Sequence, residues 1–254
     1  MSTMEYEKNK VFKIVVLAGE ILLSNGAEIF RVEDTMLRIA NAYGIKDLES
    51  FVIANGIFVT AEGEEGLLKF KIKYIPTGTT NLEKIELVNH ISREIELKHC
   101  EVDETNEKLI KILNKKTYSP KAQIAAYGLG SGSFCYFLGG DIKDTVISCL
   151  LGIILGIVMT TANTVKISKM LSNILGSAIM TILAIVVYNL GLGNHIDKII
   201  IGSIIPLVPG VAFTNAVRDF MENAYISGTV RMLDSILIAF SIALGVGVVW
   251  SIMR

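Results

Sequence analysis

Long apolar stretches fill the second half of the chain, whereas the first half mixes apolar positions with charged ones. Five apolar stretches each approach the roughly 20 residues that a helix needs to cross a bilayer. They are residues 124–140, 145–165, 170–192, 196–217 and 232–252. The first is short and rich in glycine, so a re-entrant segment is an alternative there. The pattern predicts an α-helical integral membrane protein with about five transmembrane helices.

Two amphipathic helices are predicted at the start of the chain. Apolar residues recur at helical spacing in residues 7–24 and again in residues 27–43. Asn25-Gly26 follows the first run and Gly44 follows the second, and such residues commonly end a helix because they adopt a left-handed conformation. The two helices are therefore separated by a tight turn.

Three strands are predicted next. Residues 51–54 and 57–60 are β-branched and aromatic runs, and Asn55-Gly56 between them is a strong hairpin signal. In residues 68–74 apolar and lysine side chains alternate, which is typical of a strand with one buried and one solvated face. We expect the apolar set to be buried and the lysines to be solvated: Leu68, Phe70, Ile72 and Tyr74 against Lys69, Lys71 and Lys73.

Two further helices complete the first half. Thr80 and Glu83 have the spacing of a capping box, in which each side chain satisfies a free backbone N–H at the helix start. The helix that they begin carries apolar residues at helical spacing up to Ile95. A shorter helix is expected over residues 103–113.

The charged residues divide the chain into two domains. Only 13 of the 49 Asp, Glu, Lys and Arg residues lie in residues 124–254. We predict an α+β domain at residues 1–120 and a five-span transmembrane domain at residues 121–254. Lys and Arg of the short loops favour the side of the membrane that holds the N-terminal domain, and basic loops prefer the cytoplasm. The N-terminal domain is therefore expected to be cytoplasmic, and the start of the chain lacks the pattern of a signal peptide.

Composition argues against several classes of function. The net charge of −1 and the lack of a basic stripe argue against nucleic-acid binding. The three cysteines form no CxxC pair and the three histidines show no ligand spacing, so we expect neither a disulfide framework nor a metal site. The motifs GxxxxGK[ST], GxSxG and HExxH are absent, so neither a P-loop motor nor a common hydrolase is indicated. No cofactor is expected.

A proline pair in the fourth apolar stretch is the strongest functional signal. Pro206 and Pro209, followed by Gly210, interrupt the helix because proline lacks the N–H and clashes with the preceding turn. In lipid, an open backbone is tolerated only where protein or a water-filled cavity satisfies it. Helices broken near mid-span are typical of transport sites. A helix restarted after the break aims free N–H groups at it, which suits a carboxylate. A kinked helix without a ligand is the alternative.

Polar residues near the break are candidates to complete the substrate site. Asn215 follows the break, and Thr160 and Asn163 lie in the second apolar stretch. Asn189 in the third stretch is a further candidate, although most intramembrane polar residues serve helix packing. The predicted substrate-binding set is Pro206, Pro209, Gly210, Asn215, Asn163 and Thr160.

Charged residues near both ends of the chain are candidates for gating or coupling. Arg218 and Asp219 are expected at the cytoplasmic edge of the fourth stretch. Glu28 with Arg31, and Asp34 with Arg38, stand at helical pairing distances. Exposed helical pairs contribute only about 0.3–0.5 kcal/mol. A docking or gating surface is therefore the sharper hypothesis, with a solvated helix face as the alternative.

Two motifs together resemble the threonine/serine exporter family of bacterial inner-membrane proteins. They are GAEIFRVEDTMLRIANAYG near the start and PLVPGVAFTNAVRDFMENAYISG near the end, and the likeness spans nearly the whole chain. The resemblance implies a cytoplasmic domain, five membrane helices and a further five-helix unit. Because this sequence ends at Arg254, it is similar to the larger component of a two-gene arrangement, and a smaller five-span partner subunit is expected. The matching positions are Gly26, Glu28, Arg31, Glu33, Asp34, Pro206, Pro209, Gly210, Asn215, Arg218, Asp219 and Gly228.

These observations predict a subunit of a secondary exporter rather than an enzyme. By resemblance the substrate is threonine or serine, with a dicarboxylate such as succinate as an alternative, and a proton or charge gradient would drive export. A homo-oligomer is left open. A second hypothesis is a non-transporting membrane anchor whose cytoplasmic domain binds a partner. A third is a membrane enzyme that uses Glu28, Glu33 or Asp34 as acid or base, which predicts turnover by residues 1–120 alone.

Overall fold

The computed structural model describes residues 3–62, 68–76, 78, 80–98, 100–115 and 118–253. Internal contacts divide the chain into two compact units. Unit 1 comprises Met1–Thr117 and Val211–Leu233, and unit 2 comprises Tyr118–Gly210 and Asp234–Arg254. This division differs from the predicted boundary at residue 120 in one respect, because the segment that follows the proline break clusters with the N-terminal part of the chain.

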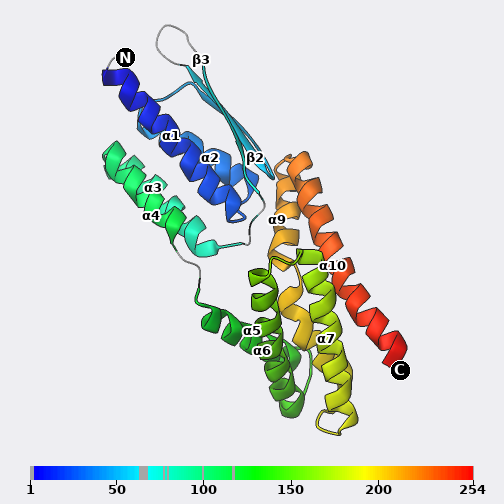
Figure 1. The fold of residues 1–254 in the computed structure, drawn as a ribbon. Helices are drawn as coiled ribbons and strands as arrows, with labels where there is room; N and C mark the ends of the chain where they lie inside the picture. Colours follow the sequence, from blue (N-terminus) through cyan, green and yellow to red (C-terminus); the bar gives the residue numbers. More distant parts are fainter. Residues whose placement is uncertain are drawn as a thin grey trace. The chain divides into compact units, whose positions relative to one another are not determined.

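Unit 1 is layered, with a sheet on one side of two helices and two more helices on the other side (Figure 1). The sheet is antiparallel in the order β1-β2-β3. The strands are β1 (Leu48–Ile53), β2 (Gly56–Glu62) and β3 (Leu68–Tyr74). The helices are α1 (Thr3–Ser24), α2 (Ile29–Ala42), α3 (Leu82–Lys98), α4 (Val102–Asn114), α9 (Gly210–Met221) and the first turns of α10 (Tyr225–Met253).

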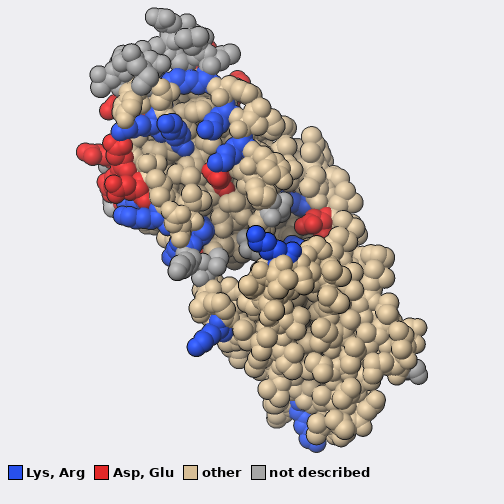
Figure 2. Space-filling model, viewed as in Figure 1, with Lys and Arg blue, Asp and Glu red and all other residues tan. Residues whose placement is uncertain are grey.

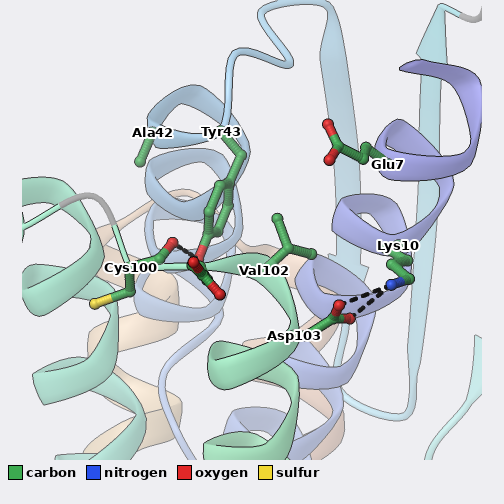
Figure 3. Close-up of a pocket in the computed structure, with 8 residues that line it drawn as sticks. Glu7, Lys10, Ala42, Tyr43, Cys100, Val102 and Asp103 are labelled. Carbon is green, nitrogen blue, oxygen red and sulfur yellow. Dashed lines mark hydrogen bonds and ion pairs between the residues drawn. The ribbon is translucent and has the colours of Figure 1, made fainter. Parts of the chain in front are cut away.

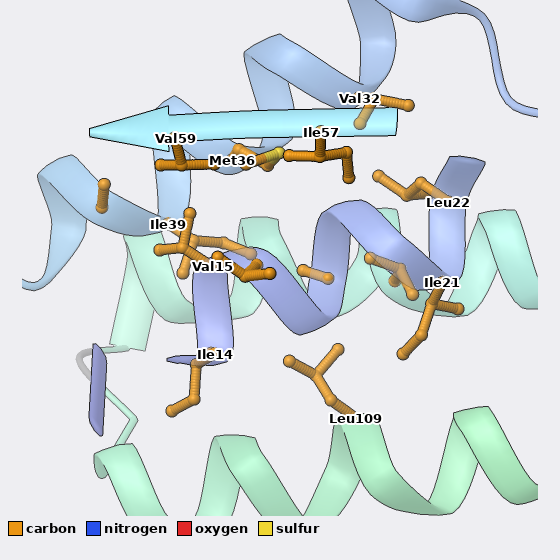
Figure 4. Close-up of a cluster of buried hydrophobic side chains, with 14 of the residues drawn as sticks. Ile14, Val15, Ile21, Leu22, Val32, Met36, Ile39, Ile57, Val59 and Leu109 are labelled. Atoms are coloured by element: carbon orange, nitrogen blue, oxygen red, sulfur yellow. The ribbon is translucent and has the colours of Figure 1, made fainter. Parts of the chain in front are cut away.

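The core of unit 1 surrounds α1. This helix is apolar on most of its faces, and Val15, Ala18 and Leu22 are fully buried in it because neighbouring elements cover it on several sides. Figure 4 shows α1 between the side chains of β2 and α2 above it and Leu109 of α4 below. Gly19 of α1 permits this close packing, since a Cβ there would overlap Met36 of α2.

The apolar side chains of β3 were predicted to be buried, and this prediction is wrong. Phe70, Ile72 and Tyr74 are 62%, 56% and 72% exposed. The lysines lie on the side of the sheet that faces the helices, because Lys73 pairs with Ile57 in register and Ile57 is fully buried. Lys73 also reaches Glu20 of α1 at 2.9 Å. Because β3 is the edge strand, it only partly overlies the helices, and a lysine on its inner face can keep its charged end near solvent. The acidic partner on α1 further favours lysine at this position.

Two local signals in unit 1 are displaced by one residue from their predicted positions. Ile53 pairs with Gly56, so the hairpin loop is Ala54-Asn55 and Gly56 already belongs to β2. The cap of α3 is Asn81 rather than Thr80, since the Lys84 N–H donates to Asn81 Oδ1 at 3.1 Å. Asparagine competes well for this position because its side chain accepts from the free N–H groups of the first turn.

Unit 2 is a bundle of apolar helices. They are α5 (Pro120–Phe137), α6 (Ile142–Thr164), α7 (Lys169–Asn189), α8 (Ile196–Ile204), the 3₁₀ turn η2 (Ile205–Leu207) and the remainder of α10. Leu155 of α6, Met180 of α7, Ile199 of α8 and Ile238 of α10 meet in its core. Figure 2 shows that charged side chains gather over unit 1, while the visible surface of unit 2 carries few.

Several of these helices are long and apolar enough to cross a membrane. Within the described residues, α6, α7 and α10 qualify, and a fourth span results if α8 with η2 and α9 are counted together as one broken span. The glycine-rich α5, which corresponds to the first predicted span, has 18 residues but is not apolar enough to qualify. The chain is therefore mostly helical, with several helices suited to a bilayer, and the count of five stays a prediction.

Candidate functional site

The helix break lies where the prolines predict it. The helix α8 ends at Ile204, η2 follows, and α9 begins at Gly210. The Val208 N–H donates to the Ile205 carbonyl at 3.0 Å, so the chain makes a tight turn before Pro209. Pro206 and Pro209 are half-buried and Gly210 is exposed. The break thus marks the end of a membrane-type helix and also the last residues of unit 2 before Val211.

A buried polar side chain of α7 lies one turn from the contact between α7 and η2. A Cβ on Gly176 would lie 3.7 Å from Leu207 of η2, and Asn173 precedes Gly176 by three residues on the same face. Asn173 is 3% exposed, yet its Nδ2 has no hydrogen-bond partner among the described residues. Ser177 and Thr181 on this face donate to carbonyls of α7 itself. Asn173 is therefore the amide on this face with unused hydrogen-bonding capacity.

Asn173 is not among the predicted site residues, although the sequence carries a signal for it. Buried polar and small residues recur along α7 at helical spacing, and Asn173 is among them. Of the asparagines predicted from the sequence, Asn163 at the end of α6 and Asn189 at the end of α7 are exposed, and Asn215 is half-buried. Thr160 donates to the carbonyl of Gly156 in its own helix.

The charged residues of the two sequence motifs come together in unit 1. Asp219 of α9 is 1% exposed, and its Oδ1 accepts the Ile29 N–H at the start of α2, at 3.1 Å. Its Oδ2 lies 3.1 Å from Nη1 of Arg231, whose side chain is 11% exposed. A buried carboxylate is tolerated where a cation and a hydrogen-bond donor both face it. Asp219 therefore joins α9, α10 and α2.

Glu28 forms the outer part of the same cluster. One of its oxygens accepts from Nε of Arg31 at 2.9 Å, and the other pairs with Arg218 of α9. The Glu28 side chain is 15% exposed, while Arg218 is 58% exposed. Three of the predicted gating residues, Glu28, Arg31 and Arg218, are thus in one ion-pair network, and Asp219 lies beside it.

Two backbone carbonyls between α1 and α2 complete the contact. Asn215 Nδ2 donates to the Gly26 carbonyl at 2.9 Å, and Arg231 Nη2 donates to the Ala27 carbonyl at 2.7 Å. Gly26 has a φ of +81°, a conformation that favours glycine. Asn215 was predicted to bind substrate, whereas its amide nitrogen is already bonded within unit 1. We name Glu28, Arg31, Asn215, Arg218, Asp219 and Arg231, with the turn at residues 26–29, the α2–α9 cluster.

The remaining acidic residues of the first motif lie apart from this cluster. Asp34 pairs with Arg38 at 2.8 Å along α2. Glu33 accepts the Val52 N–H of β1 at 3.0 Å. Burial raises the pKa of the Glu33 carboxyl, and the hydrogen bond from Val52 opposes that shift. Glu33 therefore joins α2 to β1, whereas the Asp34 pair lies within α2.

A pocket of about 480 Å³ opens on unit 1 near Tyr43 (Figure 3). Lys10 and Asp103 face each other across it at 2.7 Å, and the Tyr43 hydroxyl hydrogen-bonds to the Cys100 carbonyl and to Thr105. Burial raises the pKa of Tyr43, so its hydroxyl stays protonated at neutral pH. The Cys100 sulfur points away from Tyr43 and Lys10. The pocket therefore shows no nucleophile beside a free base.

Two loops of unit 2 place three potential metal ligands close together. The ligand atoms of Asp141, Asp144 and His195 lie within 4.8 Å of one another. These atoms already have partners, since Asp144 accepts the Asn194 N–H at 2.8 Å and lies 2.7 Å from His195 Nδ1, while Asp141 accepts from the Asn194 side chain. The cluster fastens the loop before α8 to the start of α6. Sequence spacing could not find it because the two loops are about 50 residues apart.

Comparison with known proteins gives two matches. The sequence model of the ThrE family, described as "Putative threonine/serine exporter", matches residues 13–253. A protein of Klebsiella aerogenes named "Probable succinate transporter subunit YjjP" is 22% identical over 247 residues, which cover 97% of this chain and 95% of that protein. No solved structure matches the chain.

Proposed function

Because the chain belongs to the threonine/serine exporter family, we propose that it is one subunit of a secondary exporter that moves a small polar carboxylate out of the cytoplasm. The family is one of membrane transporters, and the Klebsiella relative is likewise named as a transporter subunit. In this proposal the transport path runs through unit 2, and the N-terminal domain at residues 1–120 lies in the cytoplasm and controls the path.

The helix break at Pro206–Gly210 carries the proposal. A helix that merely anchors a domain has no need of an interruption, and opening the backbone in an apolar span is unfavourable unless a ligand or water uses the freed groups. The break is also the point where the chain passes from unit 2 to unit 1. A rearrangement at the break therefore acts directly on α9.

Asn173 is the side chain that we assign to the substrate within unit 2. Its buried amide lacks a partner among the described residues, and an unsatisfied buried polar group costs about 1–3 kcal/mol. A carboxylate can accept from this amide, as can the hydroxyl of threonine or serine. The name of the Klebsiella relative makes succinate an equal candidate for the substrate. Thr160, Asn163, Pro206, Pro209 and Gly210 remain proposed members of the site.

The α2–α9 cluster is the proposed gate. It holds α9, the helix that follows the break, through the Asn215 side chain, which donates to the Gly26 carbonyl, and through the ion pairs of Arg218 and Asp219. Arg231 of α10 donates to the Ala27 carbonyl beside them. Side chains in a packed interface exchange between a few discrete ion-pair arrangements and do not shift gradually. Such an interface can therefore act as a gate with two states. Asn215 serves as an anchor of α9 in this scheme.

A smaller membrane subunit and an ion gradient complete the proposal. The relative is named as a subunit, which supports a second chain. No GxxxxGK[ST] motif is present in the sequence, so a gradient is the simplest energy source. We propose the bacterial inner membrane as the location.

The described contacts favour neither a membrane enzyme nor a passive anchor. A membrane enzyme would use Glu28, Glu33 or Asp34 as acid or base, yet each has a structural partner: Arg218, the Val52 N–H and Arg38. A passive anchor whose soluble part binds a partner would not need the proline break. It would keep its function after the prolines are replaced.

Counterflow in proteoliposomes tests the proposed function. The full chain is reconstituted with and without the smaller subunit of the same genome, and uptake of labelled threonine, serine and succinate is measured. We expect flux of at least one substrate with both subunits present, and loss of accumulation when an ionophore collapses the gradient. Absence of flux for all three with both chains folded would refute the proposal. Turnover of a substrate by residues 1–120 alone would favour the enzyme instead.

A further inference from the structure

The outer face of the sheet in unit 1 is apolar, and most of its large described side chains are exposed. In Figure 1, β2 and β3 lie beside α1 and α2, which cover the inner face of the sheet. Strand register places Phe51, Phe58 and Ile72 side by side across the outer face. The rings of Phe51 and Phe58 are 6.0 Å apart. On the same face, Phe51, Phe70, Ile72 and Tyr74 are each more than half exposed.

The charges around this face exclude several partners. Its described positions include no lysine or arginine, because the lysines of β3 lie on the opposite face. Glu49 and Glu62 are the acidic residues in its register, and both lie at the end of the sheet that holds Phe70. A lipid headgroup surface or a nucleic acid would be repelled rather than attracted by such a face. The partner must be flat, apolar and nearly neutral.

The exposed area is enough for a specific contact between two proteins. An aromatic side chain buries about 150–250 Å², so four large side chains that are 56–72% exposed leave on the order of 500 Å² per face. Two such faces would together bury about 1,000 Å², which is the lower bound for a specific interface. A patch of this size on a monomer is commonly an interaction site.

We propose that this face binds the same face of a second copy of the chain. Two sheets that pack face to face form a layer about 10 Å thick, and each needs a flat apolar surface opposite. The chain itself presents such a surface, and a two-fold axis makes it self-complementary. The interface thus joins two copies of unit 1 into a β-sandwich.

The acidic residues define which two-fold arrangement is favourable. An axis parallel to the strands would bring the acidic ends of both copies together, whereas an axis across the strands separates them. In the second arrangement the central row, Phe51, Phe58 and Ile72, packs on its own symmetry mates. Tyr74 of one copy then lies opposite Phe70 of the other.

The mass of the detergent-purified full chain tests the interface. We expect the parent chain to be a dimer and Ile72→Glu to be a monomer. The dissociation constant of the dimer should rise at least tenfold, because the substitution places a charge at the centre of the contact. Ile72 is 56% exposed, so the variant folds. Leu97→Glu is the control, since Leu97 is 80% exposed on α3, outside the sheet, and we expect it to stay dimeric. A mass that Ile72→Glu leaves unchanged overturns the proposal.

Cysteine cross-linking tests the arrangement in the membrane. In a chain that carries Cys100→Ser, we expect Ile72→Cys to form a covalent dimer under mild oxidation. Lys71→Cys is the matched control, because Lys71 is exposed on the opposite face of the same strand. A mixture of Tyr74→Cys and Phe70→Cys chains should cross-link faster than either chain alone. Equal cross-linking of Lys71→Cys and Ile72→Cys, or of neither, overturns the proposal.

Discussion

Asp219 of α9 caps the start of α2, 190 residues earlier in the sequence, by accepting the Ile29 N–H at 3.1 Å. The residue at the N-cap position of α2 is Glu28, whose side chain makes no capping bond because it is engaged with Arg31 and Arg218. The first free N–H of α2 is therefore satisfied by the other end of the chain. The negative charge at a helix N-terminus is also favourable for the helix dipole.

Asp219→Ala should strongly destabilise unit 1. The substitution removes the cap of α2 and leaves the Arg231 guanidinium buried without the Asp219 carboxylate, and breaking a buried pair in this way costs about 3–5 kcal/mol. Asp219→Asn keeps an oxygen for the Ile29 N–H, so its effect should be smaller. Hydrogen exchange of peptides from α2 should show faster exchange at the first turn, together with earlier thermal unfolding.

Arg218→Ala provides the control for that experiment. Arg218 is 58% exposed, and solvent-exposed ion pairs contribute at most about 1 kcal/mol. If Arg218→Ala destabilised α2 as much as Asp219→Ala does, the buried pair would not be the principal link between α9 and α2.

The Glu28–Arg218 pair should govern transport more than stability. Glu28→Arg places three cations together and should slow export, and Arg218→Glu should do so by bringing two carboxylates together. The double exchange restores opposite charges, so we expect recovery, with a coupling energy of about 0.5–3 kcal/mol in a double-mutant cycle. Initial rates of counterflow give the measurement. Additive losses in the double variant would argue against a gate at this pair.

Local signals in the sequence predicted much of the fold. The proline pair predicted the break between α8 and α9, since proline acts on its own backbone wherever it stands. The helices and strands of residues 1–115 were likewise indicated by periodicity. The sequence predicted a common gating role for Glu28, Arg31 and Arg218 but not their contact. Residue spacing cannot predict a contact between positions 190 residues apart.

The wrong or missing predictions concern features that tertiary contacts determine: the buried face of β3, the burial of Asn173 and the packing of α9. The alternation in β3 is the same whichever face is buried, and the Glu20 partner of Lys73, which favours the lysine face, comes from α1. The sequence alone does not distinguish Asn173, because its burial depends on the helices around α7. The membership of α9 in unit 1 rests on Asn215, Arg218 and Asp219, whose partners lie in residues 26–29.

Replacing both prolines of the break should abolish export without loss of stability. Pro206→Ala with Pro209→Ala allows the helical ladder to continue, and a proline inside a helix costs about 3 kcal/mol. We expect counterflow to fall at least about tenfold, while the thermal stability of unit 2 is unchanged or higher. Pro120→Ala is the matched control, because Pro120 is the first residue of α5, where proline is well tolerated. Full activity of the double variant would favour the passive anchor.

The stability of unit 1 should depend on pH through Glu33. Burial raises the pKa of this carboxyl above its ordinary value of 4.5. The folded state therefore holds the proton more tightly than the unfolded state, and this contribution to stability is complete below pH 4.5 and is lost as the pH rises through the folded pKa. Glu33→Gln can still accept the Val52 N–H but does not ionise. The melting temperature of Glu33→Gln, relative to that of the parent chain, should be higher at pH 7 than at pH 4. The same difference in melting temperature at both pH values would contradict the assignment.

Substitution of Asn173 distinguishes a role in transport from a role in packing, because the two roles predict different changes in the stability of unit 2. If its amide serves only to pack α7, Asn173→Leu should lower the stability of unit 2. If the amide is held for substrate, removing an unsatisfied buried group that costs about 1–3 kcal/mol should leave the stability equal or higher. Export should then fall, and Asn173→Asp should raise the KM for an anionic substrate further, since like charges repel. Ser177→Ala is the control on the same face, because the Ser177 hydroxyl already donates to Ile174 of its own helix and should be dispensable. Melting temperature and the KM of counterflow, measured on the same preparations, distinguish the two roles.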